Sequence, residues 1–217
     1  MKYDVNKFIS TSVEWLGCNE SDGTHKNIID VYNSYIPHPR SYKVSYNDAW
    51  CATFVSAVAI KLGYTDIIPI ECSCYYMIEN AKKMGIWVEN DSYKPIIGDI
   101  IMYDWDDLGN GDNNGIPDHV GIVTKINGST FKVIEGNNNH SVSYRTMNVN
   151  DKYIRGYIHP KFTEEFAPKT NKTIKEIALC AVDVCIGVYG DGETRQTKLK
   201  NEGFDPEKIQ KVVNALM

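Results

Sequence analysis

The chain has 217 residues, and the usual size of about 150 residues per domain predicts one domain with a small addition. Its 23 basic and 28 acidic side chains give a net charge of −5, which excludes nucleic acid as the default partner because phosphate binding needs a basic surplus. Hydrophobic residues make up 42% of the chain and charged residues 24%, a balance that excludes wholesale disorder.

Apolar runs in the sequence are too short for a membrane-spanning helix, which needs about 20 apolar residues. The run at 52–60, for example, reaches about half of that length and is interrupted by Thr53 and Ser56. The first residues, MKYDVNKF, lack the apolar stretch and the cleavage site of a secretory signal. We therefore expect a protein made in the cytosol, without membrane insertion, whose six cysteines are free thiols.

Helical spacing of apolar residues predicts four helices in the first 90 residues. They span about 5–16, 28–32, 49–62 and 74–84. Asn47 and Asp48 are expected to cap the third helix at its start, and Gly63 is expected to end it.

Beyond these helices the sequence shows short segments rich in β-branched and aromatic residues, separated by glycine and asparagine turns. The segments are 99–103, 120–126, 130–135, 142–147 and 154–158. The second and third are expected to pair as a hairpin that closes near residues 127–129. Helices followed by a run of antiparallel strands predict an α+β fold.

A small helical unit is expected at the C-terminus. Residues 161–172 are polar and without periodicity, which predicts a linker between a first domain of residues 1–160 and a second of residues 173–217. The second domain opens with a capping-box pattern at 173–176, and Asp-Pro at 205–206 is typical of a helix start. We predict a compact three-helix bundle, near the lower size limit for a domain that folds alone.

Cys51 is the strongest candidate for chemistry. In the first turn of a predicted helix, free N–H groups and the positive end of the helix dipole lower the pKa of a thiol and favour the nucleophilic thiolate. The alternative is a small buried cysteine of the core, the commoner role on an apolar helix. Cys72 and Cys74 have no second pair at zinc spacing and are interpreted as structural.

A nucleophilic cysteine needs a base, and the base needs a group that orients it. His119 stands at the start of one predicted strand and Glu135 at the end of the next, so hairpin pairing brings the two to the same end. Asn137 is a second candidate for the orienting role. Taken singly these are ordinary polar residues at strand ends, but with Cys51 they form a nucleophile, a base and an orienter. His140 is the rival base, in an asparagine-rich turn.

Several motifs follow one another in the first domain. They are 50–56 (WCATFVS), 98–101 (GDII), 104–106 (DWD), 118–123 (DHVGIV), 134–137 (IEGN) and 156–157 (GY). Their content and order resemble the CHAP domain, the cysteine, histidine-dependent amidohydrolase/peptidase family, which has a papain-like fold and cleaves peptidoglycan. The resemblance implies that Cys51 is the nucleophile and His119 the general base, with Glu135 and Asn137 as orienting groups. It also implies attack on a peptidoglycan amide through a thioester.

The loop from Asp104 to Asp118 is longer than the family pattern and rich in Asp, Asn and Gly. Oxygen-rich loops of this kind bind Ca²⁺, but this one lacks the EF-hand pattern. We expect a solvated loop that lines the cleft and no cofactor, with Ca²⁺ binding as the alternative.

Three motifs also occur in the predicted C-terminal unit. They are 187–195 (GVYGDGETR), 203–205 (GFD) and 209–214 (IQKVVN). They resemble the short cell-wall-binding repeats at the C-termini of some phage endolysins, which bind the muropeptide portion of peptidoglycan. The resemblance implies Tyr189, Asp191 and Arg195 as ligand contacts. The alternatives are internal packing for Tyr189, a helix N-cap for Asp191 and an exposed charge for Arg195.

Together the two resemblances imply a phage endolysin that hydrolyses bacterial peptidoglycan, either as an N-acetylmuramoyl-L-alanine amidase or as an endopeptidase. A chain without a secretory signal fits a protein that accumulates in the host cytoplasm and reaches the wall by holin-type release. Two other functions stay open, a papain-like peptidase or transamidase acting on proteins and a wall-binding protein without catalysis. Amidase and endopeptidase use the same cysteine and histidine chemistry, so the residues leave both open.

Overall fold

The computed structural model describes residues 3–90, 93–106, 115–163 and 173–216. The chain divides into two compact units, Met1–Thr163 and Glu164–Met217. The first unit combines helices with one sheet, so the predicted α+β fold is confirmed. In the second unit the described residues form helices joined by turns. Residues 164–172 of the predicted linker lie outside the described residues.

The helices of the first unit precede its sheet, as predicted. They are α1 (Val5–Val13), α2 (Lys26–Asn33), the 3₁₀ turn η1 (Pro39–Ser41), α3 (Cys51–Leu62) and α4 (Cys74–Lys83). Gly63 ends α3 in the left-handed conformation, with φ 67°, as predicted.

The predicted cap of α3 is wrong, because the helix begins after Trp50 rather than after Asn47 or Asp48. The carboxylate of Asp48 instead accepts a hydrogen bond from the backbone N–H of Ser45 at 2.7 Å, within the preceding turn. The first turn of α3 therefore has no side-chain cap, and Cys51 is the first residue whose backbone N–H lacks an acceptor within the helix.

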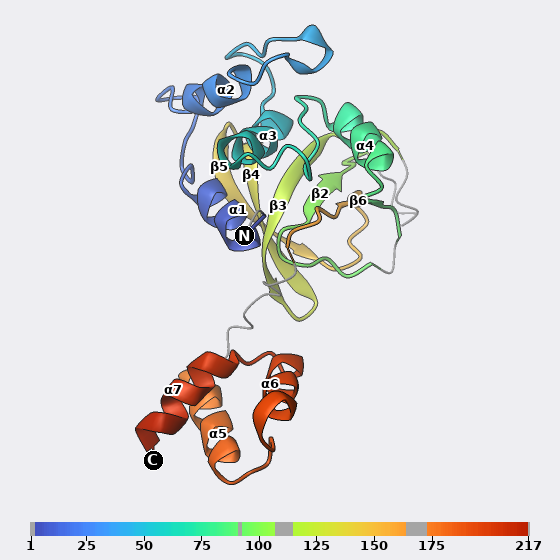
Figure 1. The fold of residues 1–217 in the computed structure, drawn as a ribbon. Coiled ribbons are helices and arrows are strands. Elements are labelled where there is room, and N and C mark those ends of the chain that lie inside the picture. The colour runs from blue at the N-terminus through green and yellow to red at the C-terminus, as the bar shows by residue number, and fades with distance from the viewer. Residues whose placement is uncertain (1–2, 91–92, 107–114, 164–172, 217) are drawn as a thin grey trace. The chain divides into compact units, whose positions relative to one another are not determined.

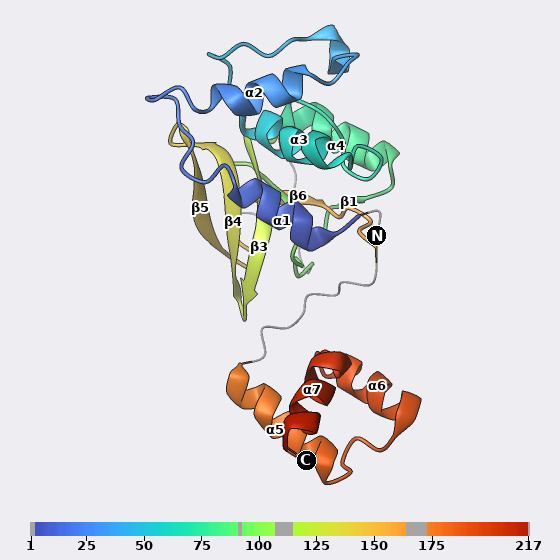
Figure 2. The same ribbon diagram turned by 60° about the vertical axis from the view of Figure 1, so that its left-hand side comes forward.

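The strands form one antiparallel six-stranded sheet in the order β1-β6-β2-β3-β4-β5 (Figures 1 and 2). They are β1 (Trp87–Val88), β2 (Ile100–Tyr103), β3 (His119–Asn127), β4 (Thr130–Asn138), β5 (Ser141–Asn148) and β6 (Ile154–Ile158). The predicted β3–β4 hairpin is confirmed, with Asn127 opposite Thr130. β1 escapes prediction because two residues carry no periodicity.

The central part of the sheet is buried on both faces. In β2, Ile100 and Met102 pack into the core shared with the helices, while Ile101 and Tyr103 pack into a second core on the opposite face. α3 is the central helix of the first core, since it packs against β3 and β4 and also contacts α1 and α2 (Figure 1). The N-terminal end of α3 is thereby fixed relative to the ends of β3 and β4.

The second unit contains α5 (Ile174–Cys185), α6 (Gly192–Asn201) and α7 (Pro206–Leu216), at the predicted positions. The capping box of Thr173 and Glu176 is present, and the Asp205 carboxylate accepts from two N–H groups in the first turn of α7. The three helices share a small core. It consists of Cys180, Ala181, Val184, Tyr189, Leu199, Ile209 and Val213.

None of the helices within the described ranges is long and apolar enough to cross a bilayer. All six cysteines are free thiols, and they occur in both units.

A glycine lets α3 approach the sheet next to the predicted site. A Cβ at Gly136 of β4 would lie 2.3 Å from Cβ of Phe54 and 3.1 Å from the Trp50 indole. Gly136 is therefore a contact point between the first turn of α3 and the strand that carries Glu135 and Asn137.

We expect Gly136→Ala to lower the free energy of unfolding of the first unit by about 1–3 kcal/mol, because α3 must move off β4 to admit the methyl group. Urea unfolding followed by tryptophan fluorescence reports on this unit alone, since all four tryptophans belong to it. Ser129→Ala, in the exposed β3–β4 turn, is the control and should change little. Equal midpoints for the two variants would contradict the packing argument.

Candidate active site

Cys51 is the first residue of α3 and is 7% exposed. At this position the first N–H groups of the helix lack intrahelical acceptors and the helix dipole is positive. Its thiol interacts with the side chain of His119, and its Sγ lies 3.7 Å from Sγ of Cys74. The structure thus brings Cys51 and His119 together, as the sequence predicts.

His119 begins β3, directly opposite Tyr103 of β2. Its ring stacks on the Tyr103 ring at 5.8 Å between centroids and lies 6.2 Å from the ring of Trp105. Nε2 of His119 is 3.2 Å from Oε2 of Glu135. Because Nε2 faces the carboxylate, Nδ1 is the ring nitrogen left for Cys51.

Glu135 is fully buried in the second half of β4, and its carboxylate is held by three neighbouring side chains. Oε1 accepts from the Tyr103 hydroxyl at 2.8 Å and from Nε of Arg145 at 2.8 Å. Oε2 faces His119 and also accepts from Nε of Arg145, at 3.0 Å. Gly121 of β3 leaves the space that this side chain fills, since a Cβ there would lie 2.7 Å from Cγ of Glu135.

These contacts shift the pKa values of Cys51 and His119 so that both side chains favour their ionised forms. Hydrogen bonds from Cys74 and His119 lower the pKa of the Cys51 thiol well below its usual value, although burial opposes them. Burial would lower the pKa of His119, but its bonds with Cys51 and Glu135 raise it to about 9. At neutral pH the geometry therefore favours a thiolate beside an imidazolium.

Glu135 remains a carboxylate in this arrangement. Burial would raise its pKa, but the hydrogen bonds from His119 and Arg145 hold it below its ordinary value. A buried anion with two cationic partners can orient the imidazole and stabilise its charge without taking its proton.

Asn137 does not reach His119. Its backbone has φ 57°, and its side chain lies beside Trp50 and Glu20. With the amide oriented to match both neighbours, it donates to Oε1 of Glu20 at 3.2 Å and accepts from the Trp50 backbone N–H at 3.3 Å. Asn137 thus contacts the residue before Cys51 rather than the imidazole.

His140, the rival base, belongs to this second polar group. Its Nδ1 lies 2.9 Å from Oε2 of Glu20, and its side chain is largely exposed. Trp50 donates its indole N–H to Oε1 of the same carboxylate at 2.9 Å. The structure therefore pairs His140 with Glu20, and it pairs His119 with Glu135.

Sequence reasoning missed three residues of the site. Tyr103 and Arg145 hold Glu135, and Cys74, interpreted as structural, lies against Cys51. The sequence held a signal for Arg145. Its strand β5 pairs with β4, which carries Glu135, so the carboxylate of Glu135 is a natural partner for the arginine.

Among the described residues, no group of three or more His, Cys, Asp or Glu side chains is arranged to hold a metal ion. In the loop proposed as a Ca²⁺ alternative, 107–114 lie outside those residues. At the ends of the loop, Asp118 accepts from the Trp105 N–H at 2.7 Å and Asp104 from the Asp106 N–H at 3.0 Å.

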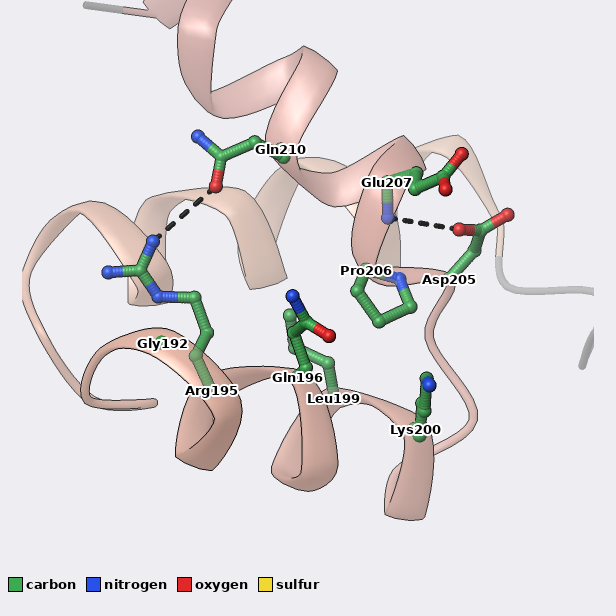
Figure 3. A pocket seen from close by; sticks show the side chains of 9 residues that line it. All are labelled: Gly192, Arg195, Gln196, Leu199, Lys200, Asp205, Pro206, Glu207 and Gln210. Carbon is green, nitrogen blue, oxygen red and sulfur yellow. Dashed lines mark hydrogen bonds between the residues drawn. The ribbon is translucent and has the colours of Figure 1, made fainter.

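The second unit has a hollow of about 450 Å³ between α6 and α7 (Figure 3). Arg195, Gln196 and Lys200 line it from α6, and Gln210 lines it from α7. Arg195 donates to Oε1 of Gln210 across the hollow at 3.4 Å.

The three predicted ligand contacts lie in different surroundings. Tyr189 is buried in the small core and its hydroxyl donates to Oε2 of Glu202, while Asp191 is the N-cap residue of α6. Asp191 is highly exposed and pairs with Arg195. Of the three, Arg195 alone lines the hollow.

Comparisons with known proteins agree with both resemblances. The family model of the CHAP domain matches residues 41–137, and that of the CW_7 repeat matches residues 180–217. The chain thus carries a CHAP domain followed by a CW_7 repeat. No curated protein matches the chain.

Two solved structures resemble the chain at 14% sequence identity. They are the crystal structure of Ly7917 with the hydrolyzing product of MDP (TM-score 0.43) and the crystal structure of Ly7917 (TM-score 0.41). Each similarity covers 72% of this chain, and 63% and 62% of the respective Ly7917 chains.

We expect Glu135→Gln to lower the pKa of His119 from about 9, because the amide removes the negative charge that favours the imidazolium. NMR titration of the imidazole resonances measures this shift. His159 is the internal control, since the separate carboxylate of Asp99 raises its pKa. A His119 titration identical to that of the wild type would contradict the role assigned to Glu135.

Proposed function

We propose that the protein is a peptidoglycan hydrolase that cleaves an amide bond with Cys51 as nucleophile. One observation carries the proposal. Within the stretch matched by the CHAP family, a thiol at a helix N-terminus contacts an imidazole that is anchored to a buried carboxylate. This arrangement supplies a nucleophile, a proton carrier and an orienting group for acyl transfer.

In the proposed reaction the Cys51 thiolate attacks the amide carbonyl and forms a tetrahedral intermediate. The N–H groups of the first turn of α3, including that of Cys51, point toward the developing oxyanion and stabilise it. His119 gives its proton to the leaving amine, which leaves a thioester on Cys51. A water molecule, deprotonated by His119, then hydrolyses the thioester, which releases the Cys51 thiolate beside the protonated imidazole.

Asn137 has a separate part in this proposal. It accepts from the backbone N–H of Trp50, which immediately precedes the nucleophile, and it bridges to Glu20. Trp50 is fully buried and its indole is held by the same carboxylate. We therefore assign to Asn137 and Glu20 the fixing of the turn that presents Cys51, and to Glu135 the orientation of His119.

The C-terminal unit is proposed to bind the wall. Peptidoglycan stem peptides carry free carboxylates. The hollow between α6 and α7 is lined by two cations, Arg195 and Lys200, and by two carboxylates, Asp205 and Glu207. An arginine with a planar fork of donors suits a carboxylate ligand. Because the whole chain carries a net charge of −5, attraction to anionic walls must come from local contacts of this kind.

We expect Cys51→Ala to reduce wall hydrolysis by about 10⁴-fold or more, because no other group replaces the nucleophile. Turbidity loss of purified cell walls measures the rate, and mass spectrometry of the released muropeptides identifies the bond that the wild type cuts. Cys185→Ala, an exposed thiol of the second unit, is the control and should retain wild-type activity. Continued lysis by Cys51→Ala would refute the mechanism.

We expect Arg195→Ala and Gln196→Ala to weaken wall binding, the first by about tenfold or more, since a hydrogen bond to a charged group contributes about 1.5–3 kcal/mol. Co-sedimentation with purified walls is measured in the Cys51→Ala background, so that the walls stay intact. Lys211→Ala, at an exposed position of α7 that does not line the hollow, is the control. Equal loss of binding in all three variants would argue against this hollow as the site.

A further inference from the structure

A second thiol lies against the proposed nucleophile. Cys74 is the first residue of α4, just as Cys51 is the first residue of α3, and both side chains are buried. Their Sγ atoms are 3.7 Å apart, a contact in which one thiol donates a hydrogen bond to the other sulfur. Two helix N-termini therefore meet at a pair of sulfur atoms.

The surrounding charges decide which sulfur keeps its proton. Cys51 faces the imidazole of His119, whereas the carboxylate of Asp118 acts on Cys74. Contact with Cys51, burial and the charge of Asp118 all raise the pKa of the Cys74 thiol well above its usual value. Cys51 is thus the sulfur that ionises, and Cys74 is the donor.

We propose that Cys74 is a positioning residue that donates its S–H to the Cys51 sulfur and so stabilises and aims the nucleophilic thiolate. The assignment of Cys51 as nucleophile rests on the function proposed above. In this arrangement the Cys51 proton moves to His119, Cys74 keeps its own proton throughout, and no bond forms between the two sulfurs. The donor acts on the free thiolate and, when the thioester is hydrolysed, on the thiolate that departs.

The chemistry of the donor suits this task. An S–H group is a weak donor, so it favours the ionised form of Cys51 without holding the sulfur as strongly as a hydroxyl would. Because the Cys51 side chain is buried, few other hydrogen-bond donors can approach its sulfur. Beyond Cys74, the polar groups that lower its pKa are His119 and the backbone N–H of Ala52.

The test measures the ionisation of Cys51 directly, through the pH dependence of its alkylation by iodoacetamide. Fully reduced, full-length protein is alkylated across a pH series, and modification of the Cys51 peptide is quantified by mass spectrometry. We expect Cys74→Ala to move the Cys51 profile upward by roughly one pH unit, the shift expected when an anion loses a hydrogen-bond donor. Cys74→Ser keeps a donor, and its profile should lie at or below the wild-type pH.

Cys72→Ala is the matched control, since this thiol lies two residues away and contacts Arg40. Its Cys51 profile should coincide with that of the wild type. A wild-type profile in Cys74→Ala would overturn the proposal, as would an upward shift in Cys74→Ser as large as that in Cys74→Ala.

Wall hydrolysis by the wild type is measured in parallel and separates the two proposals. If Cys74→Ala shifts the Cys51 alkylation profile but the wild type cleaves no peptidoglycan, the proposed function is refuted and the inference about Cys74 stands. If the wild type cleaves peptidoglycan but Cys74→Ala leaves the Cys51 profile unchanged, the inference about Cys74 is refuted and the proposed function stands.

Discussion

The buried carboxylate of Glu135 is the group on which the rest of the site depends. A charge with no contact with water is stable only when other groups compensate it, and here the compensation comes from three strands. Tyr103 reaches it from β2, His119 from β3 and Arg145 from β5. The interaction that joins the strands also sets the direction of the imidazole. Removal of one partner from a buried ion pair typically destabilises a protein by about 3–5 kcal/mol, so the geometry of His119 is tied to the stability of the sheet.

The charges of the site alternate along one line of contacts. The Cys51 thiolate faces the His119 imidazolium, which faces the Glu135 carboxylate, which faces the Arg145 guanidinium. Two anions and two cations sum to zero, and each buried charge has an opposite neighbour. The hydrogen bond from Cys74, together with this balance, lowers the pKa of Cys51 at a place where burial alone would keep the thiol protonated. Arg145, which sequence reasoning missed, is the member that completes it.

Local patterns predicted what depends on near neighbours in the chain, and they failed where packing decides. The end of α3 at Gly63 and the hairpin that joins His119 to Glu135 follow from periodicity and turn residues. The start of α3 at Cys51 does not, because Asp48, a predicted cap, bonds within the preceding turn instead. The contact of Arg145 depends on the β4–β5 register, which is irregular after Glu135. Cys74 meets Cys51 only because the fold brings the first residues of α3 and α4 together. The sequence predicts Asn137 beside the imidazole, but its side chain faces Trp50 and Glu20, and its backbone is in the left-handed conformation.

The coupling between Cys51 and His119 also times the proton transfer in the proposed reaction. While the thiolate is free, its charge helps to hold the pKa of His119 near 9, so the proton is retained. Attack on a carbonyl moves the negative charge from the sulfur to the oxyanion of the tetrahedral intermediate, and His119 loses the support of the thiolate while its burial remains. Its pKa must then fall, which makes the imidazolium a stronger acid at the moment when the leaving amine needs a proton. Glu135 limits this fall, because its own charge is shared with Arg145 and stays in place through every step.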